Sequence, residues 1–394
     1  MTIAAAIDSR TAEAPARPRT SRIARVDIVR DFAQAEAIWR ELEERQLATP
    51  YQRFGMLSAW QSEVGNRESA EPFIVTAHDA DGRPLVLLPL VLRIRRGVRI
   101  ASFMGGKHTT FNMALWDLDF AREATAADLA DLLSALRAKA AADVLALTQQ
   151  PEHWQDHLNP FAMLPRQRSV NDCPVMTMAP GDPPENRISK SFRGRLKGKE
   201  RKLQGPGYRY HMASTDADIE RLLNWFFHVK PMRMAEQKLP DVFAEPGVAD
   251  FVRKTCRAPF AGGRVIDIHA LECDDEVIAI FAGVADGDRF SMMFNTYTMS
   301  GRARYSPGLI LMRHIIDHYG ERRYRALDLG IGSDDYKRLF CKGDEPIFDS
   351  FVPLTSRGRI AAIAMSGFNR VKRQVKHNRV LLDLAQRLRH ATKS

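Results

Sequence analysis

The sequence predicts an α/β (α+β) protein made of two similar halves, each a mixed, mostly antiparallel sheet flanked by helices. Its 394 residues favour two compact domains over one, because single hydrophobic cores stop growing at roughly 250–300 residues. Both halves also follow one order: a helix, a hairpin around an acidic turn (residues 78–83 and 273–276), an apolar strand, a loop of small residues and a helix. One fold used twice is therefore the expected architecture.

The first domain, residues 23–180, is expected to open with two helices and to continue as a sheet. Asp81-Gly82 is a strong signal for a hairpin turn, since glycine tolerates the positive φ that such turns need. The expected helices are 31–47, 56–64 and 124–142, and the expected strands are 72–78, 84–94, 99–103, 112–118 and 143–148. Residues 1–22 are rich in Ala, Pro, Arg and Thr, and we predict that they are disordered.

The second domain, residues 187–358, follows a proline-rich linker at 180–184. It begins with a strongly basic helix and contains a three-strand meander. The expected helices are 187–203, 216–229 and 248–257, the meander strands are 264–273, 277–285 and 289–297, further strands are 208–212 and 347–354, and 231–246 is expected to be a loop. Residues 359–394 are predicted to form a basic helical tail.

The stretch 305–342 follows the meander and carries a candidate anion site. Ser306-Pro307-Gly308 predicts a helix start, because serine is a good N-cap and proline suits the first helical position. A short strand at 325–329, a glycine turn and a further helical turn come next. Backbone N–H groups and the helix dipole at such a start can hold an anion, although most loop-to-helix joints bind nothing.

Composition and residue spacing limit the partners, the cellular compartment and the metal sites that we expect. A net charge of +10 favours anionic partners such as phosphorylated cofactors, nucleic acid or a membrane surface. The four cysteines lack metal-site or redox spacing, which fits a reducing compartment. With no signal-peptide core and no apolar run near the roughly 20 residues that span a bilayer, we expect a cytoplasmic protein. His314 and His318 have helical i,i+4 spacing but no third ligand, so no metal is predicted.

Several short motifs occur in a fixed order along the chain. They are Ser189-Lys190 before the basic helix, residues 275–282, residues 305–308, residues 328–330 and residues 334–337, with residues 49–52, Trp60 and residues 87–90 in the first half. Together they resemble the CelD-like acetyltransferases of the GNAT superfamily, which are associated with cellulose and exopolysaccharide biosynthesis. More distantly, the pattern is similar to FemAB-type aminoacyltransferases, which also pair two GNAT-like domains.

The resemblance implies a mixed sheet that splays open to admit an acyl donor, acetyl-CoA or another acyl-CoA. In GNAT enzymes the loop before a central helix holds the donor pyrophosphate through backbone N–H groups. Here that position falls on Arg302, Arg304, Tyr305, Ser306, Gly308 and Leu309, which are the predicted donor-binding residues. The loop departs from the family pattern at Pro307, which has no N–H, and Arg302 and Arg304 could supply charge instead.

Direct acyl transfer needs a base, donors for the oxyanion and an acid for the leaving thiolate. Asp328 is the predicted base or acceptor-orienting residue, at a strand end that a splayed sheet would expose; alternatively it caps the glycine turn. Tyr336 is the predicted acid, or else it packs on the sheet. Lys337 is predicted to hold a donor phosphate or an acceptor carboxylate. FemAB-type proteins, which the pattern resembles more distantly, have a lysine in a similar place before a phenylalanine.

Three further residues are candidates for substrate binding. Asn295 and Tyr297 end a meander strand that faces the loop. His269 alternates with Asp267 along its strand, so both side chains are expected on one side, although a lone strand histidine is more often structural.

The predicted function is transfer of an acetyl or longer acyl group from acyl-CoA to the nitrogen or oxygen of a small-molecule or saccharide-linked acceptor, in cell-envelope or exopolysaccharide metabolism. The acceptor is expected to enter between the two halves. No nucleic acid is expected, except tRNA if the protein is a FemAB-type aminoacyltransferase that uses aminoacyl-tRNA. A non-catalytic GNAT-derived regulator of a polysaccharide synthase is a further alternative.

The sequence allows more than one role for each of two basic segments. The helix at 187–204 could be a solvated face, a clamp for phosphates or a nucleic-acid surface. The tail could pack on the domain or make peripheral contact with anionic lipid beside a membrane synthase.

Overall fold

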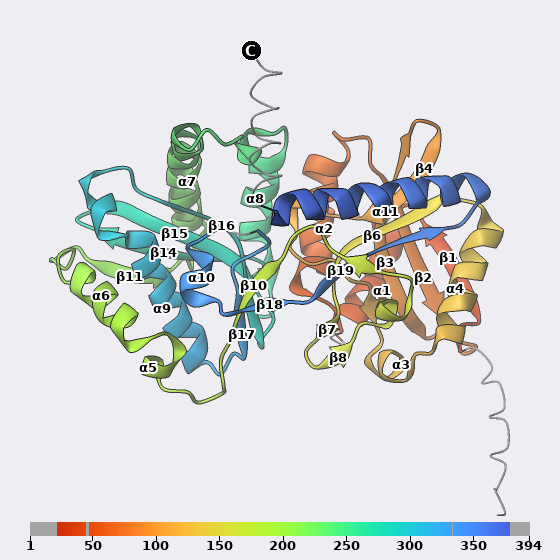
Figure 1. The fold of residues 1–394 in the computed structure, drawn as a ribbon, viewed down its shortest axis with the longest axis horizontal. Coiled ribbons are helices and arrows are strands. Elements are labelled where there is room, and N and C mark those ends of the chain that lie inside the picture. The colour runs from red at the N-terminus through yellow and green to blue at the C-terminus, as the bar shows by residue number, and fades with distance from the viewer. Residues whose placement is uncertain (1–21, 45–46, 333, 379–394) are drawn as a thin grey trace, which may run out of the picture.

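The computed structural model describes residues 22–44, 47–332 and 334–378. They form two α/β units that lie side by side, each with a mixed sheet covered by helices, as the sequence predicts (Figure 1). The predicted disorder of residues 1–22 and the last part of the predicted tail concern residues outside these ranges, apart from Arg22.

The sheet of the first unit has eight strands, in the order β1-β2-β3-β4-β6-β19-β9 with β5 on β3. All neighbours are antiparallel except β4 and β6. The strands are β1 (Arg25–Val29), β2 (Glu71–His78), β3 (Pro84–Arg95), β4 (Val98–Phe103), β5 (Leu115–Trp116), β6 (Val144–Pro151), β9 (Gln167–Arg168) and β19 (Ile347–Pro353). The helices are α1 (Phe32–Glu44), α2 (Phe54–Trp60), α3 (Leu118–Glu123), α4 (Ala126–Lys139) and α11 (Ser356–His377).

The sheet of the second unit has seven strands, in the order β11-β14-β15-β16-β17-β10-β18. The pair β16–β17 is parallel and the other pairs are antiparallel. The strands are β10 (Cys173–Thr177), β11 (Arg209–Met212), β14 (Asp267–Cys273), β15 (Glu276–Ala285), β16 (Arg289–Tyr297), β17 (Ala326–Asp328) and β18 (Gly343–Glu345). The helices are α5 (Pro184–Arg187), α6 (Lys190–Glu200), α7 (Asp216–Glu236), α8 (Val248–Arg257), α9 (Pro307–Glu321) and α10 (Lys337–Phe340).

The two sheets exchange strands. β10 precedes the proline-rich linker in sequence but lies between β17 and β18 of the second sheet. β19 follows the second unit in sequence but lies between β6 and β9 of the first sheet. The sheets therefore do not follow the predicted boundary between residues 23–180 and 187–358, because each unit is completed by a strand from beyond that boundary.

Two local predictions are wrong. The helix predicted to end at Val229 continues through Pro231 to Glu236. Pro231 removes one backbone donor, but Val229 and Arg233 on either side are buried, and this packing keeps the helix intact. The strand predicted at 112–118 is reduced to the two residues of β5, because Asp117 caps α3 by accepting a hydrogen bond from the Phe120 N–H.

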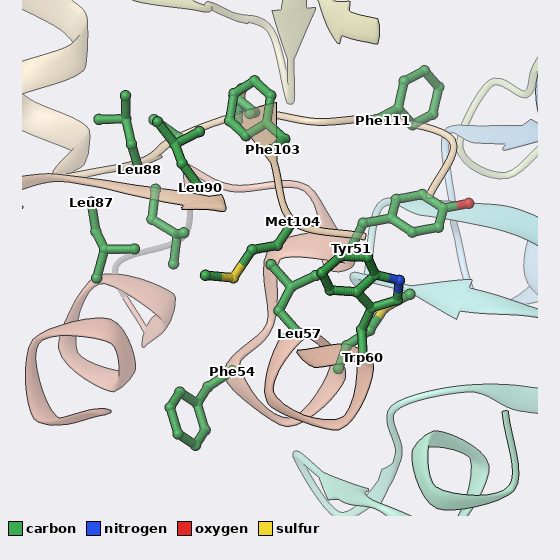
Figure 2. Packing of buried hydrophobic residues seen from close by; sticks show 14 of the residues in the cluster. Tyr51, Phe54, Leu57, Trp60, Leu87, Leu88, Leu90, Phe103, Met104 and Phe111 are labelled. Atoms are coloured by element: carbon green, nitrogen blue, oxygen red, sulfur yellow. The ribbon is translucent and has the colours of Figure 1, made fainter. Parts of the chain in front are cut away.

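One hydrophobic core runs through both units. It includes Trp39 and Trp60 of the first unit and Phe226 and Phe251 of the second. Figure 2 shows part of this core, in which Leu57 and Trp60 of α2 lie near Met104, and Leu87, Leu88 and Leu90 of β3 lie beyond it. Helix α8 packs directly on α2. The relative placement of the units is thus set by buried apolar surface, which is the main favourable term in folding.

Helix α11 is tied to the first sheet at its start. Thr355 caps the helix by accepting from the Gly358 N–H, and its own hydroxyl donates to Asp143 at 3.0 Å. Gly358 lies so close to β6 that a Cβ there would come 1.7 Å from the Asp143 carbonyl oxygen. Gly367, in the same helix, has nothing within 4 Å of the corresponding point.

These two glycines give a matched test of the docking. Gly358→Ala forces the helix away from Asp143, so we expect it to lower the free energy of unfolding by about 1–3 kcal/mol. Gly367→Ala should raise it by about 0.4–1 kcal/mol, because alanine restricts the unfolded chain without a clash. Urea unfolding of both variants measures the difference. Equal effects of the two substitutions would contradict the close approach at Gly358.

Candidate active site

The sheet of the second unit splays open between β16 and β17. The two strands pair in parallel at three positions, and the last pair is Ser291 with Asp328. Beyond it β17 ends in a turn at Gly330, whose φ is +72°, whereas β16 continues to Tyr297 paired with β15 alone. This parting of β16 and β17, called the fork below, was implied by the resemblance. Beyond it, the edge of β16 that faced β17 has no strand partner.

Two cavities meet at this fork. The first, of about 480 Å³, lies between α7, the end of β16 and the start of α9. The second, of about 230 Å³, is enclosed by the first unit's loop 107–110, by α8 and by the middle of β16. Asn295, Asp334 and Tyr336 line both cavities. The Asn295 side-chain amide donates to the Tyr336 hydroxyl at 3.3 Å, so this pair stands where the cavities join.

The start of α9 offers few backbone donors to the first cavity. Pro307 has no N–H, and the N–H groups of Leu309 and Ile310 donate to the Ser306 carbonyl at 3.0 and 3.2 Å. Of these first helical residues, at most Gly308 can turn its N–H to a ligand. Ser306 stands at the N-cap position and Pro307 begins the helix, as predicted, but Ser306 has a left-handed backbone (φ 58°) and its side chain makes no capping hydrogen bond.

The positive charge at the first cavity comes from α6 and α7. Lys230 and Arg233 of α7 line the cavity. The Arg233 guanidinium lies 3.5 Å from the centre of the Tyr297 ring, and the Lys230 ammonium donates to the Asn295 carbonyl at 3.0 Å. Lys199 of α6 donates to the Ser306 hydroxyl at 2.7 Å. Burial lowers the pKa of Lys230, and the neighbouring Arg233 adds to this effect.

The sequence analysis missed Lys230 and Arg233 because it ended their helix at Val229. The i,i+3 spacing of the two cations was the signal that could have found them. The structure shows that Pro231 between them does not break the helix.

The predicted donor-binding residues divide into two groups. Ser306, Gly308 and Leu309 line the first cavity. Arg302 instead forms ion pairs with Glu276 and, at 2.9 Å, with Asp274. The exposed Arg304 lies 4.8 Å from the centre of the Tyr305 ring, and neither of these residues is among the lining residues of the cavity. Arg302 and Arg304 therefore do not supply the positive charge expected at the first cavity. Lys230 and Arg233 supply it instead.

Asp328 is fully buried, so the expectation that a splayed sheet exposes it is wrong. Its carboxylate accepts from the Ser291 hydroxyl at 2.5 Å and from the Gly330 N–H at 3.1 Å. The structure supports the alternative, that Asp328 caps the glycine turn. Burial raises the pKa of Asp328 from its ordinary value of 3.8 to about 6, although Arg289 and Ser291 oppose this shift. Its catalytic role stays a prediction.

Tyr336 and Lys337 differ in whether their polar groups can reach a ligand. The Tyr336 hydroxyl lies at the junction of the cavities, and burial raises its pKa, so it stays protonated at neutral pH. The Lys337 ammonium donates to the Gly330 and Ile331 carbonyls at 3.1 and 2.9 Å and forms an ion pair with Asp334 at 3.4 Å. These contacts can use all three donors of the ammonium, so Lys337 holds the turn that shapes the fork.

The predicted substrate-binding residues also divide. Asn295 and Tyr297 line the first cavity. His269 is fully buried in a different place, with Tyr210 at 2.9 Å from its Nδ1 and Tyr319 at 3.0 Å from its Nε2. Tyr319 also donates to Asp267 at 3.0 Å, which confirms that Asp267 and His269 share one side of β14. Burial holds the pKa of His269 well below its usual range, and these contacts are those of a structural histidine.

His108 is a site residue that the sequence analysis missed. It lines the second cavity, and its Nδ1 accepts a hydrogen bond from the Trp60 indole at 3.0 Å. Burial lowers the pKa of His108, so the ring is neutral and its proton sits on Nε2. That Nε2 is buried and has no hydrogen-bond partner among the residues described. It can therefore donate to a ligand, and the signal for it in sequence was one histidine in a loop of small residues.

Part of the second unit matches a known family of domains. A family model described as an acetyltransferase (GNAT) domain matches residues 190–338. No curated protein matches the chain by sequence.

Solved structures are similar over most of the chain. The C-terminal domain of a candidate lysylphosphatidylglycerol synthetase from Agrobacterium fabrum is 12% identical, with 85% of this chain and 95% of that chain covered and a TM-score of 0.50. A conserved protein of unknown function from Bacteroides thetaiotaomicron is 11% identical, with coverage of 84% and 100% and a TM-score of 0.51. FemX is 7% identical, with coverage of 77% and 96% and a TM-score of 0.49.

Residues 190–338 thus match a GNAT acetyltransferase domain, and the predicted fold class, two mixed and mostly antiparallel sheets flanked by helices, is confirmed. Among the described residues, no group of His, Cys, Asp and Glu side chains is placed to hold a metal ion. Every helix in the described ranges is too short or too polar to cross a membrane.

The raised pKa of Asp328 predicts a pH dependence of stability. The folded state binds its proton more tightly than the unfolded state, so this contribution is present below about pH 4 and is lost as the pH rises through about 6. The difference from 3.8 corresponds to about 3 kcal/mol. Urea unfolding between about pH 4 and pH 7 should show a steeper loss for the wild type than for Asp328→Asn. Parallel profiles would show that Asp328 does not titrate in this range.

Proposed function

We propose that the protein is an acyltransferase that moves an acyl group from acyl-CoA to an amine or hydroxyl. The observation that carries this proposal is the meeting of two cavities at Asn295 and Tyr336, beside the open edge of β16. The donor occupies the first cavity, where Lys230 and Arg233 face its phosphates. The acceptor enters the second cavity, which the two units form together.

The chemistry follows from this arrangement. The acceptor nitrogen or oxygen attacks the thioester carbonyl, a new C–N or C–O bond forms, and the C–S bond breaks. Backbone N–H groups on the open edge of β16 can bind the carbonyl oxygen as it gains charge. The Tyr336 hydroxyl holds its proton at neutral pH and can donate it to the leaving thiolate. The acceptor releases its own proton to solvent water, and solvent returns a proton to Tyr336, so the number of protons balances.

The biological setting is part of the same proposal. The ordered motifs at residues 275–282, 305–308 and 328–330 resemble those of the CelD-like group. On that ground we propose a cytoplasmic role in cell-envelope or exopolysaccharide metabolism, with a small-molecule or saccharide-linked acceptor.

A second candidate is aminoacyl transfer from aminoacyl-tRNA, as in FemAB-type enzymes. The observation that favours it is the scarcity of N–H donors at the start of α9, together with the cations of α6 and α7 around the same cavity. Side-chain cations can hold nucleic-acid phosphates as well as those of coenzyme A. One protein that shares the fold is described as a candidate lysylphosphatidylglycerol synthetase.

Donor binding provides the first test. Acetyl-CoA, longer acyl-CoAs and coenzyme A should each raise the melting temperature of the protein. Arg233→Ala should weaken binding by about tenfold or more, since hydrogen bonds to charged groups contribute about 1.5–3 kcal/mol. Arg302→Ala is the matched control and should bind normally, because Arg302 is paired with Asp274 and Glu276 away from the cavity.

Other outcomes would replace the proposal. Binding of aminoacyl-tRNA without any thermal shift from a thioester would favour the second candidate. A protein that binds neither donor would be a non-catalytic GNAT-derived regulator.

The role of Tyr336 provides a second test. Tyr336→Phe removes the proton donor while keeping the ring, so we expect kcat to fall by about a hundredfold with little change in the KM for acyl-CoA. Thiol release from acyl-CoA, measured against a panel of amine and hydroxyl acceptors, reports the rate. Tyr305→Phe, next to the cavity but not lining it, should leave the rate unchanged. An unchanged kcat in Tyr336→Phe would remove this residue from the mechanism.

A further inference from the structure

Helix α11 has one face fixed to the first unit. It lies across that unit in Figure 1 and packs on β19 and β6. Gly358 and Ala362 are buried against the sheet. Further along, Asn369 donates to Asp349 at 2.9 Å and Arg373 pairs with Asp172 at 3.1 Å. These contacts set the rotation of the helix about its axis and so decide which side chains point outward.

The outward face is apolar. Ile360 is 73% exposed, Ile363 69%, Phe368 67% and Val371 58%. They span about 16 Å of helix at 1.5 Å per residue. Together with Ile94, which is 70% exposed, they are the five most exposed large apolar side chains among the described residues.

Ile94 belongs to a neighbouring element. It lies in the β3–β4 hairpin, and the Gly97 carbonyl of that hairpin accepts a hydrogen bond from Arg357 of α11 at 2.9 Å. The hairpin therefore extends the apolar surface at the start of the helix. Arg95 and Arg96, also exposed, add positive charge at the same end.

The charge around this face has one sign. Residues 356–377 contain six Lys or Arg and neither Asp nor Glu. At 100° per residue, Arg357 and Lys372 fall on one side of the line through Ile360 and Val371, and Arg359 and Arg370 fall on the other. An exposed apolar stripe bordered by cations is the pattern of a helix that lies in a membrane interface.

We propose that α11, with the tip of the β3–β4 hairpin, docks the protein on the surface of an anionic lipid bilayer. The apolar side chains enter the boundary between headgroups and acyl chains, and the bordering cations contact lipid phosphates. Charge complementarity selects this occupant, because a second copy of the chain would bring the same uncompensated cations against this face. The proposal is independent of the reaction at the fork, since α11 contributes no residue to either cavity.

Vesicle binding by the full chain tests this inference. The wild type should sediment with vesicles of phosphatidylglycerol and phosphatidylcholine, should bind much less to pure phosphatidylcholine, and should dissociate as salt is added. Replacing Ile360, Ile363, Phe368 and Val371 by Ser should weaken binding by about tenfold or more. The control Leu158→Ser/Met163→Ser, which removes exposed apolar side chains elsewhere on the first unit, should bind like the wild type. Circular dichroism and thermal unfolding check that each variant is folded.

A local probe adds a readout that does not depend on affinity. The wild type has five tryptophans, so the signal of the new residue is the emission of Phe368→Trp minus that of the wild type. This difference should shift to shorter wavelength with anionic vesicles and should be quenched by brominated lipid. Equal vesicle binding of the wild type and the serine variant, or no change in emission at position 368, would overturn the proposal. A dimer of the wild type that becomes monomeric in the serine variant would also overturn it, because a second copy would then cover this face.

Discussion

The parting of β16 from β17 after the pair Ser291–Asp328 is the constraint on which the candidate site depends. Two parallel strands normally continue together, because each unpaired backbone group loses a hydrogen bond. Here β17 ends because the chain turns at Gly330, and the buried Asp328 carboxylate binds both the Gly330 N–H and the Ser291 hydroxyl. On its other side β17 is held by β10, through the pair Val175–Asp328. The position where β17 ends is thus fixed by hydrogen bonds to β16 and by pairing with β10.

The first unit completes the site from outside the GNAT domain. Its loop 107–110 forms a wall of the second cavity and contributes the unpaired Nε2 of His108. The close contact of α8 with the first unit holds this wall in place: a Cβ at Gly247 would lie 1.9 Å from the Glu63 carbonyl oxygen. The strands β10 and β19 also hold the two units together. If the units separated, each sheet would lose a strand. In the proposed reaction, an acceptor between the units would meet a preformed surface.

The electrostatics of the first cavity differ from those of a backbone anion site. A helix start that recognises phosphate through N–H groups needs several free donors, and here the Ser306 carbonyl already binds two of them. Side-chain cations from α6 and α7 take that place. A guanidinium held over an aromatic ring, as Arg233 is over Tyr297, is preorganised and loses little freedom on binding. In the proposed function, recognition of the donor by this cavity would depend on charge and shape.

Much of the fold could be predicted from the sequence by local rules. The hairpin turn at Asp81-Gly82, the helix 248–257 and the meander strands ending in Tyr297 follow from periodicity and turn chemistry, and the structure has them close to the predicted bounds. The motif order also indicated the GNAT domain that the family model matches at residues 190–338. What only the tertiary structure decided depends on contacts between distant segments. Burial of Val229 and Arg233 carries α7 past Pro231. Strand pairing places β10 in the second sheet and β19 in the first. Asp328 is buried at the point where the strands part, while Tyr336 and His108 reach the cavities. Local sequence patterns do not encode these outcomes, because each depends on which surfaces meet once the whole chain has folded.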